Sequence, residues 1–224
     1  MSRLSRYSRA VSLYDQTWGR IMAAGYDRFL AGTEDAGLSD WREELVERAS
    51  GRTLEVGAGT GLNLSHYPEA VDELALTEPF GPMVKRLRAS VTESGRNADV
   101  VKASADALPF DDASFDTVVG TLVLCTVEDQ EPVLAEVRRV LRPGGRLLFI
   151  EHVRAGDPKL ARWQDRLHRP WRWFGHGCNC NRDTRAAIEA AGFEITELTE
   201  RAMPKAPPIV RPVISGTAVS PPLS

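Results

Sequence analysis

The stretch Leu54-Glu55-Val56-Gly57-Ala58-Gly59-Thr60-Gly61 decides the fold of this 224-residue chain. Arg52 to Val56 predicts a short apolar strand, and Leu62 to Tyr67 can open a helix. The alternating glycines between them predict a tight turn whose backbone can approach a nucleotide closely, because a Cβ at those positions would clash. Backbone N–H groups at the start of the helix would then point at the ligand.

The spacing of these glycines separates two kinds of nucleotide site. A dinucleotide site needs glycines at the first, third and sixth positions, but here the sixth position is Leu62 and the third glycine, Gly61, comes one residue early. This pattern, with Glu55 on the strand, resembles that of S-adenosylmethionine (SAM) enzymes rather than NAD enzymes. An ordinary Gly-rich turn is the alternative. The expected SAM contacts in this stretch are Glu55, Gly57, Ala58, Gly59, Thr60 and Gly61.

The composition is that of one globular α/β domain with an N-terminal elaboration. A net charge of −3 does not support nucleic-acid binding, and three cysteines argue against a disulfide framework. The sequence has no apolar run of about 18 residues and no signal peptide. We therefore expect a cytoplasmic protein with no integral membrane segment, and the sequence leaves its oligomeric state open.

The first 50 residues are expected to form an N-terminal arm and helices that contribute to a cap. Met1 to Ser12 carry three arginines and no acid, which predicts either a frayed terminus or a basic arm in peripheral contact with anionic lipid or substrate. Tyr14 to Leu30 and Ser39 to Ser50 have the apolar stripes of helices.

From Arg52 onwards strands and helices alternate, which predicts a parallel sheet. Two final strands, joined by the proline-rich segment Pro204 to Pro212, predict a closing hairpin. The expected strands are Arg52–Val56, Glu73–Thr77, Asp99–Ala103, Phe115–Leu124, Arg146–His152, Phe193–Arg201 and Val213–Val219, and the expected helices between them are Pro82–Glu93, Glu131–Leu141 and Arg182–Ala191.

Two further positions fit a nucleoside ligand. Glu78 ends the second strand 21 positions after Gly57, where a carboxylate can accept both ribose hydroxyls; a solvated turn acid before Pro79 is the alternative. The fourth strand brings Thr121 and Leu122 to the carboxyl edge of the sheet, where ligands of open α/β sheets bind.

Several segments together resemble class I SAM-dependent methyltransferases, and in particular the animal methyltransferase-like thiol S-methyltransferases. The resemblance runs from about Leu54 to Val219. Its most particular parts are the strand Leu122-Val123-Leu124-Cys125 and the downstream Gly177-Cys178-Asn179. The other segments are Thr126 to Glu131, Val140 to Gly145, Glu151-His152-Val153, Trp163-Gln164, Pro170-Trp171, Arg182, Thr184 and Val210-Arg211-Pro212.

The resemblance implies a Rossmann-like α/β fold with a seven-stranded, mostly parallel sheet, an antiparallel C-terminal strand and helices on both faces. It implies a methyltransferase domain at residues 51–220, with 159–181 as a lid-like insertion. SAM is the implied cofactor and S-adenosylhomocysteine its product. Asp106 would accept the adenine amino group, with Pro79 and Ala107 also in contact with the cofactor.

The favoured methyl acceptor is a small or apolar thiol. The runner-up is a lipid or quinone methyltransferase acting on nitrogen or carbon, and a SAM-binding module without turnover is the rival from outside the enzymes. His152, at the end of the fifth strand, is the candidate to help deprotonate the acceptor, with a packed histidine as the alternative.

Trp163 and Trp171 either line an apolar substrate pocket, with Cys178 and Asn179 at its mouth, or pack a helical lid. Cys178-Asn179-Cys180 lacks the usual spacing of zinc ligands, so no metal site is expected. Two departures from the family pattern stand out: a polar N-terminal arm replaces the hydrophobic membrane anchor, and Glu78 replaces the usual Asp.

Overall fold

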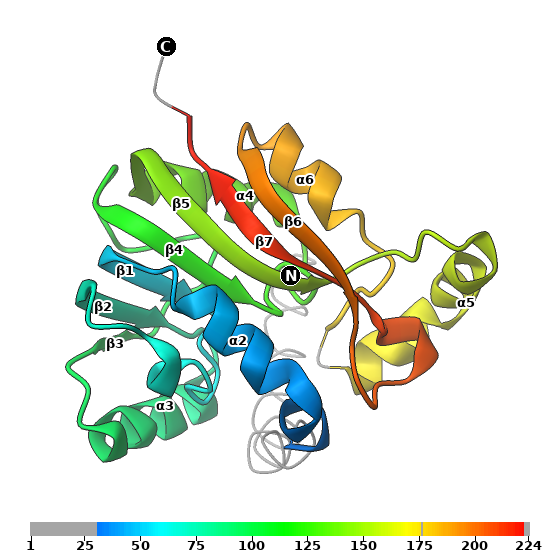
Figure 1. Cartoon of the computed structure of the whole chain (residues 1–224), viewed down its shortest axis with the longest axis horizontal. Helices are drawn as coiled ribbons and strands as arrows, with labels where there is room; N and C mark the ends of the chain where they lie inside the picture. Colours follow the sequence, from blue (N-terminus) through cyan, green and yellow to red (C-terminus); the bar gives the residue numbers. More distant parts are fainter. Residues whose placement is uncertain (1–30, 176, 222–224) are drawn as a thin grey trace, which may run out of the picture.

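The computed structural model describes residues 31–175 and 177–221, so the expected arm at Met1–Ser12 and helix at Tyr14–Leu30 lie outside the described residues. The described chain forms a seven-stranded sheet of order β3-β2-β1-β4-β5-β7-β6 (Figure 1). Strand β7 is antiparallel to both of its neighbours, and the other pairs are parallel, which confirms the expected class. The strands are β1 (Gly51–Val56), β2 (Val71–Thr77), β3 (Asp99–Val101), β4 (Phe115–Thr121), β5 (Leu141–His152), β6 (Glu194–Ala202) and β7 (Pro212–Val219).

Helices cover both faces of the sheet because successive strand residues point to opposite sides. Val119 packs into one core with residues of α2 and α3, whereas Val118 packs into the other with residues of α4 and α6. Figure 1 shows α2 in front of the sheet, with α4 and α6 behind it. The described helices are η1 (Glu34–Leu38), α2 (Ser39–Val46), η2 (Leu64–His66), α3 (Gly81–Ser94), α4 (Gln130–Val140), α5 (Pro158–Phe174), α6 (Thr184–Ala190) and η3 (Pro208–Val210). Among them is no helix with the length and apolar character needed to cross a membrane.

The segment after the glycine turn differs from the prediction. Leu62 to Tyr67 does not open an α-helix; it forms turns and the short 3₁₀-helix η2. The reason is a pair of side-chain bonds to the buried carboxylate of Glu55, which accepts from Asn63 Nδ2 at 2.9 Å and from the Tyr67 hydroxyl at 2.6 Å. These bonds hold the segment against β1, so the glycine turn does not lead directly into a regular helix.

Strand β4 is also shorter than predicted, ending at Thr121 rather than Leu124. Leu122 has a positive φ of 60°, a conformation that costs a residue other than glycine about 1–3 kcal/mol. The chain then turns so that the N–H groups of Val123, Leu124 and Cys125 all donate to the Glu151 carboxylate, at 2.8–2.9 Å. A buried acid on β5 therefore ends β4 and shapes the loop after it.

Candidate active site

A cavity of about 310 Å³ lies at the carboxyl ends of β1, β2 and β4. This is where open α/β sheets bind ligands. Six of the predicted cofactor contacts line it: Gly57, Gly59, Glu78, Pro79, Thr121 and Leu122. The other lining residues, which the sequence did not single out as contacts, are Phe80, Met83, Ser104, Ala105, Val123, Thr126 and Val127.

The three glycines of the turn have distinct roles. All have positive φ values, 62° at Gly57, 59° at Gly59 and 91° at Gly61. A Cβ on Gly57 would lie 2.8 Å from Val123 Cγ2, and one on Gly61 would lie 2.7 Å from Leu64 Cδ1. A Cβ on Gly59 would meet no protein atom within 4 Å. Gly57 and Gly61 therefore permit close packing, whereas Gly59 leaves the cavity open to a ligand.

Glu78 is the acidic group of the cavity. Its carboxylate accepts the N–H of Gly59 at 3.1 Å and that of Phe80 at 2.9 Å, which ties the end of β2 to the glycine turn. The residue is only 7% exposed, and burial raises the pKa of its carboxyl above the ordinary 4.5. An acceptor-only group at the edge of this cleft suits the two hydroxyls of a ribose.

Glu55 lies behind the turn rather than on the cavity wall. It is buried, and burial raises its pKa to about 7. Its partner Asn63 accepts from Arg42 Nη1 at 3.0 Å, and the same nitrogen donates to Thr121 Oγ1 at 2.8 Å. Arg42 also pairs with Glu34 at 3.1 Å. Helix α2 thus contacts a residue of the cavity wall through a buried arginine. No local sequence pattern predicts this contact.

Five predicted cofactor contacts lie near the cavity but outside its lining. Ala58, Thr60 and Gly61 belong to the glycine turn but are not among the lining residues, and the Ala58 N–H donates to Thr77 O at 2.9 Å. Asp106 and Ala107 are exposed in the turn that follows the lining residues Ser104 and Ala105.

The two most particular segments of the sequence meet beside the cavity. The Asn179 backbone N–H and side-chain Nδ2 both donate to Cys125 O, at 2.6 and 3.2 Å. A Cβ on Gly177 would lie 3.0 Å from Thr126 O, so the contact is close. Arg182 adds a bond of 2.9 Å to Leu124 O. Cys178 and Asn179 are therefore buried behind the loop after β4 and hold it in place.

Glu151 anchors the same loop from the other side. It is fully buried, and burial raises its pKa to about 7 although three N–H groups favour the carboxylate. A hydrogen bond with the thiol of Cys178, together with burial, raises the pKa of Cys125 well above its ordinary value. Glu151 thus supports the cavity wall without lining it.

The predicted base and the predicted tryptophans also lie outside the cavity lining. Burial lowers the pKa of His152 to about 4, and its Nδ1 has no hydrogen-bond partner within the described chain. Trp163 is 54% exposed on α5, and Trp171 is partly buried against the core. The described residues include no cluster of three His, Cys, Asp or Glu side chains that could hold a metal ion.

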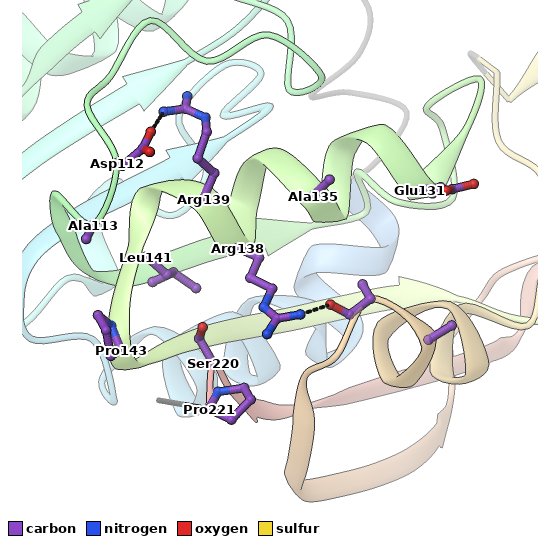
Figure 2. Close-up of a pocket in the computed structure, with 12 residues that line it drawn as sticks. Asp112, Ala113, Glu131, Ala135, Arg138, Arg139, Leu141, Pro143, Ser220 and Pro221 are labelled. Atoms are coloured by element: carbon purple, nitrogen blue, oxygen red, sulfur yellow. Dashed lines mark hydrogen bonds and ion pairs between the residues drawn. The ribbon is translucent and has the colours of Figure 1, made fainter. Parts of the chain in front are cut away.

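A second hollow, of about 500 Å³, lies where α4 runs into β5, away from the glycine turn (Figure 2). Its arginines are engaged by the protein: Arg138 donates to Ala191 O at 3.0 Å, and Arg139 pairs with Asp112 at 2.6 Å. None of the predicted site residues lines it, so the cavity beside Glu78 is the candidate site.

Comparison with known proteins agrees with this geometry. A methyltransferase-domain family model matches residues 54–149. Human thiol S-methyltransferase TMT1A is 39% identical over 170 residues, which cover 74% of this chain and 69% of the relative. The chain belongs to the thiol S-methyltransferase family. It is a SAM-dependent methyltransferase.

More distant similarities are with other methyltransferases. A phosphatidylethanolamine N-methyltransferase from Cereibacter sphaeroides is 29% identical over 75% of this chain and 80% of its own. The structure of a geranyl diphosphate methyltransferase in complex with SAM superposes with a TM-score of 0.62 at 14% identity, over 81% of this chain and 84% of the other. The open face of Gly59 and the carboxylate of Glu78 fit SAM as the ligand of this cavity.

Proposed function

We propose that this methyltransferase acts on the sulfur of a small or apolar thiol. The observation that carries the proposal is the chemistry of the cavity wall. Glu78 is the one ionisable side chain among the described residues that line it. Its carboxylate would bind the ribose hydroxyls of SAM. The rest of the lining is uncharged and largely apolar, with Phe80, Leu122 and Val127 among its residues.

A wall without a general base suits an acceptor that ionises readily. A thiol of pKa about 8.5 is a few per cent thiolate near pH 7, so it needs no strong base. Proton removal from carbon needs a positioned base and loses roughly 10²–10⁴ in rate without one. His152 is a weak base because its pKa is lowered to about 4, so it does not offset this loss.

The chain's own residues bind and orient the reactants. SAM, when bound, supplies a methyl group on a sulfonium, which is already activated for in-line displacement. Glu78 would hold its ribose, and Asp106 and Ala107 its adenine. Glu151 and Asn179 hold the loop after β4, which contributes Val123, Thr126 and Val127 to the cavity lining. Such positioning can contribute roughly 7–11 kcal/mol to lowering the barrier.

The cap and lid are part of the same proposal. Residues 1–50 would contribute a cap, supported by the bonds of Arg42 to Thr121 and Asn63. Residues 159–181 would serve as a lid-like insertion on the domain at 51–220, supported by the bonds between Asn179 and Cys125. The cytoplasm is the proposed compartment, and the free thiols of Cys125, Cys178 and Cys180 are in keeping with reducing conditions.

The second candidate acceptor is a lipid or quinone, favoured by the similarity to the phosphatidylethanolamine N-methyltransferase. Incubation with methyl-labelled SAM and a panel of thiols, amines, phenols and quinols decides between them. We expect label on the thiols and none with the Gly59→Val variant. Label on an amine or a quinol alone would refute the thiol acceptor, and label on no acceptor would favour a SAM-binding module.

A further inference from the structure

Helix α5 carries a band of exposed large apolar side chains. Trp163 is 54% exposed, Leu167 37%, Trp173 55% and Phe174 62%, and within the described part of the chain the exposed large apolar residues all belong to this helix. Trp163, Leu167 and Phe174 are spaced by four and seven residues, which places them on one face. Single exposed apolar residues are ordinary, but a contiguous band marks an interaction surface.

Basic side chains lie along the same helix. Lys159, Arg162, Arg166, Arg169 and Arg172 are all exposed. The one acid of the helix, Asp165, pairs with Arg154 at 2.5 Å. The helix therefore carries a net charge of +4, whereas the whole chain carries −3, so the remainder carries −7. The guanidinium of Arg166 lies 5.8 Å from the centre of the Trp163 ring, which joins the basic and aromatic groups into one surface.

The opposite face of α5 fixes the helix firmly to the domain. Gln164 is fully buried, donates to the carbonyls of Val153, Cys180 and Ile209 at 2.8–3.0 Å, and accepts the N–H of Ala155 at 2.8 Å. The exposed band thus lies on the outside of a well-anchored helix. Figure 1 shows α5 at the end of the molecule that β5 points toward, which is the carboxyl-end side of the sheet.

We propose that α5 docks this protein on the surface of an anionic lipid bilayer. Tryptophan, phenylalanine and leucine on a helix that also carries several arginines are typical of helices that lie in the membrane interface, where aromatic rings enter the headgroup region and cations contact lipid phosphates. A second copy of the chain fits less well, because it would bring one +4 helix against another. Nucleic acid also fits less well, because the chain outside this helix carries a net charge of −7.

Cosedimentation with vesicles tests the proposal. The full chain should bind vesicles of phosphatidylcholine containing phosphatidylserine, and bind pure phosphatidylcholine at least tenfold more weakly. Trp163→Ala with Phe174→Ala, and separately Arg166→Glu with Arg169→Glu, should each reduce binding at least tenfold. The control pair Lys85→Glu with Arg88→Glu makes the same charge change on the exposed side of α3 and should leave vesicle binding within twofold of the wild-type value.

The outcomes are distinct from those of the methyl-transfer assay, because vesicle binding is measured without SAM or acceptor. Wild-type protein that stays in the supernatant with anionic vesicles would overturn the proposal. Binding that both α5 variants retain would assign the contact to another surface, such as the N-terminal arm, and would equally overturn it. Circular dichroism of each variant confirms that the substitutions, all at exposed positions, leave the fold intact.

Discussion

Gly59→Val should abolish SAM binding while leaving the domain folded. The left-handed backbone at φ +59° costs a residue with a Cβ about 1–3 kcal/mol, but no protein atom lies within 4 Å of the new Cβ. Because Gly59 lines the cavity, the added side chain fills ligand space. Micromolar binding corresponds to a binding free energy of about −8 kcal/mol. We expect the variant to bind SAM at least 100-fold more weakly, a loss of about 2.7 kcal/mol.

Gly61→Ala is the matched control. Its Cβ would lie 2.7 Å from Leu64 Cδ1 and 3.1 Å from Leu87 Cδ1. This overpacking should lower the free energy of unfolding by about 1–3 kcal/mol, in addition to the cost of the left-handed backbone. In a thermal-shift assay, S-adenosylhomocysteine at 100-fold its Kd should raise the wild-type Tm by about 5–10 °C. Gly59→Val should show no such rise, and Gly61→Ala should start from a lower Tm. If S-adenosylhomocysteine raised the Tm of Gly59→Val as much as that of the wild type, the assignment of the cavity beside Gly59 to SAM would be refuted.

Three other predictions follow from the site. Glu78→Ala should weaken SAM binding by about 1.5–3 kcal/mol, measured by calorimetric titration; unchanged affinity would remove its ribose role. Burial raises the pKa of Glu55 to about 7, so the folded state holds its proton between pH 4.5 and 7 and the free energy of unfolding falls as pH rises through that window. In denaturant titrations between pH 4.5 and 7, Glu55→Gln should reduce the dependence of the unfolding free energy on pH by up to about 1.4 kcal/mol per pH unit. The same pH dependence in wild type and variant would contradict the raised pKa. For an alkyl thiol, kcat/KM should rise with pH toward the thiol's own pKa, and His152→Ala should lower it by no more than about 100-fold; a larger loss would make His152 an essential base.

Much of the fold and part of the site could be predicted from short stretches of sequence. The glycine turn, the alternation of strands and helices and the acid at the end of β2 are local patterns, because backbone sterics and side-chain periodicity act over a few residues. These patterns led to Gly57, Gly59, Glu78 and Thr121, all of which line the cavity.

The tertiary structure decided what depends on groups far apart in the chain. The segment after Gly61 is not an α-helix because Asn63 and Tyr67 bond to Glu55, and β4 ends early because its next N–H groups turn to Glu151, 26 to 28 residues away. Arg42 reaches Thr121 across 79 residues. Trp163 of α5 is exposed whereas Trp171 packs against the core, and both positions depend on the side of the helix from which Gln164 bonds to the domain. A buried charge or amide takes whichever partners the folded chain brings within about 3 Å, and no local pattern specifies them.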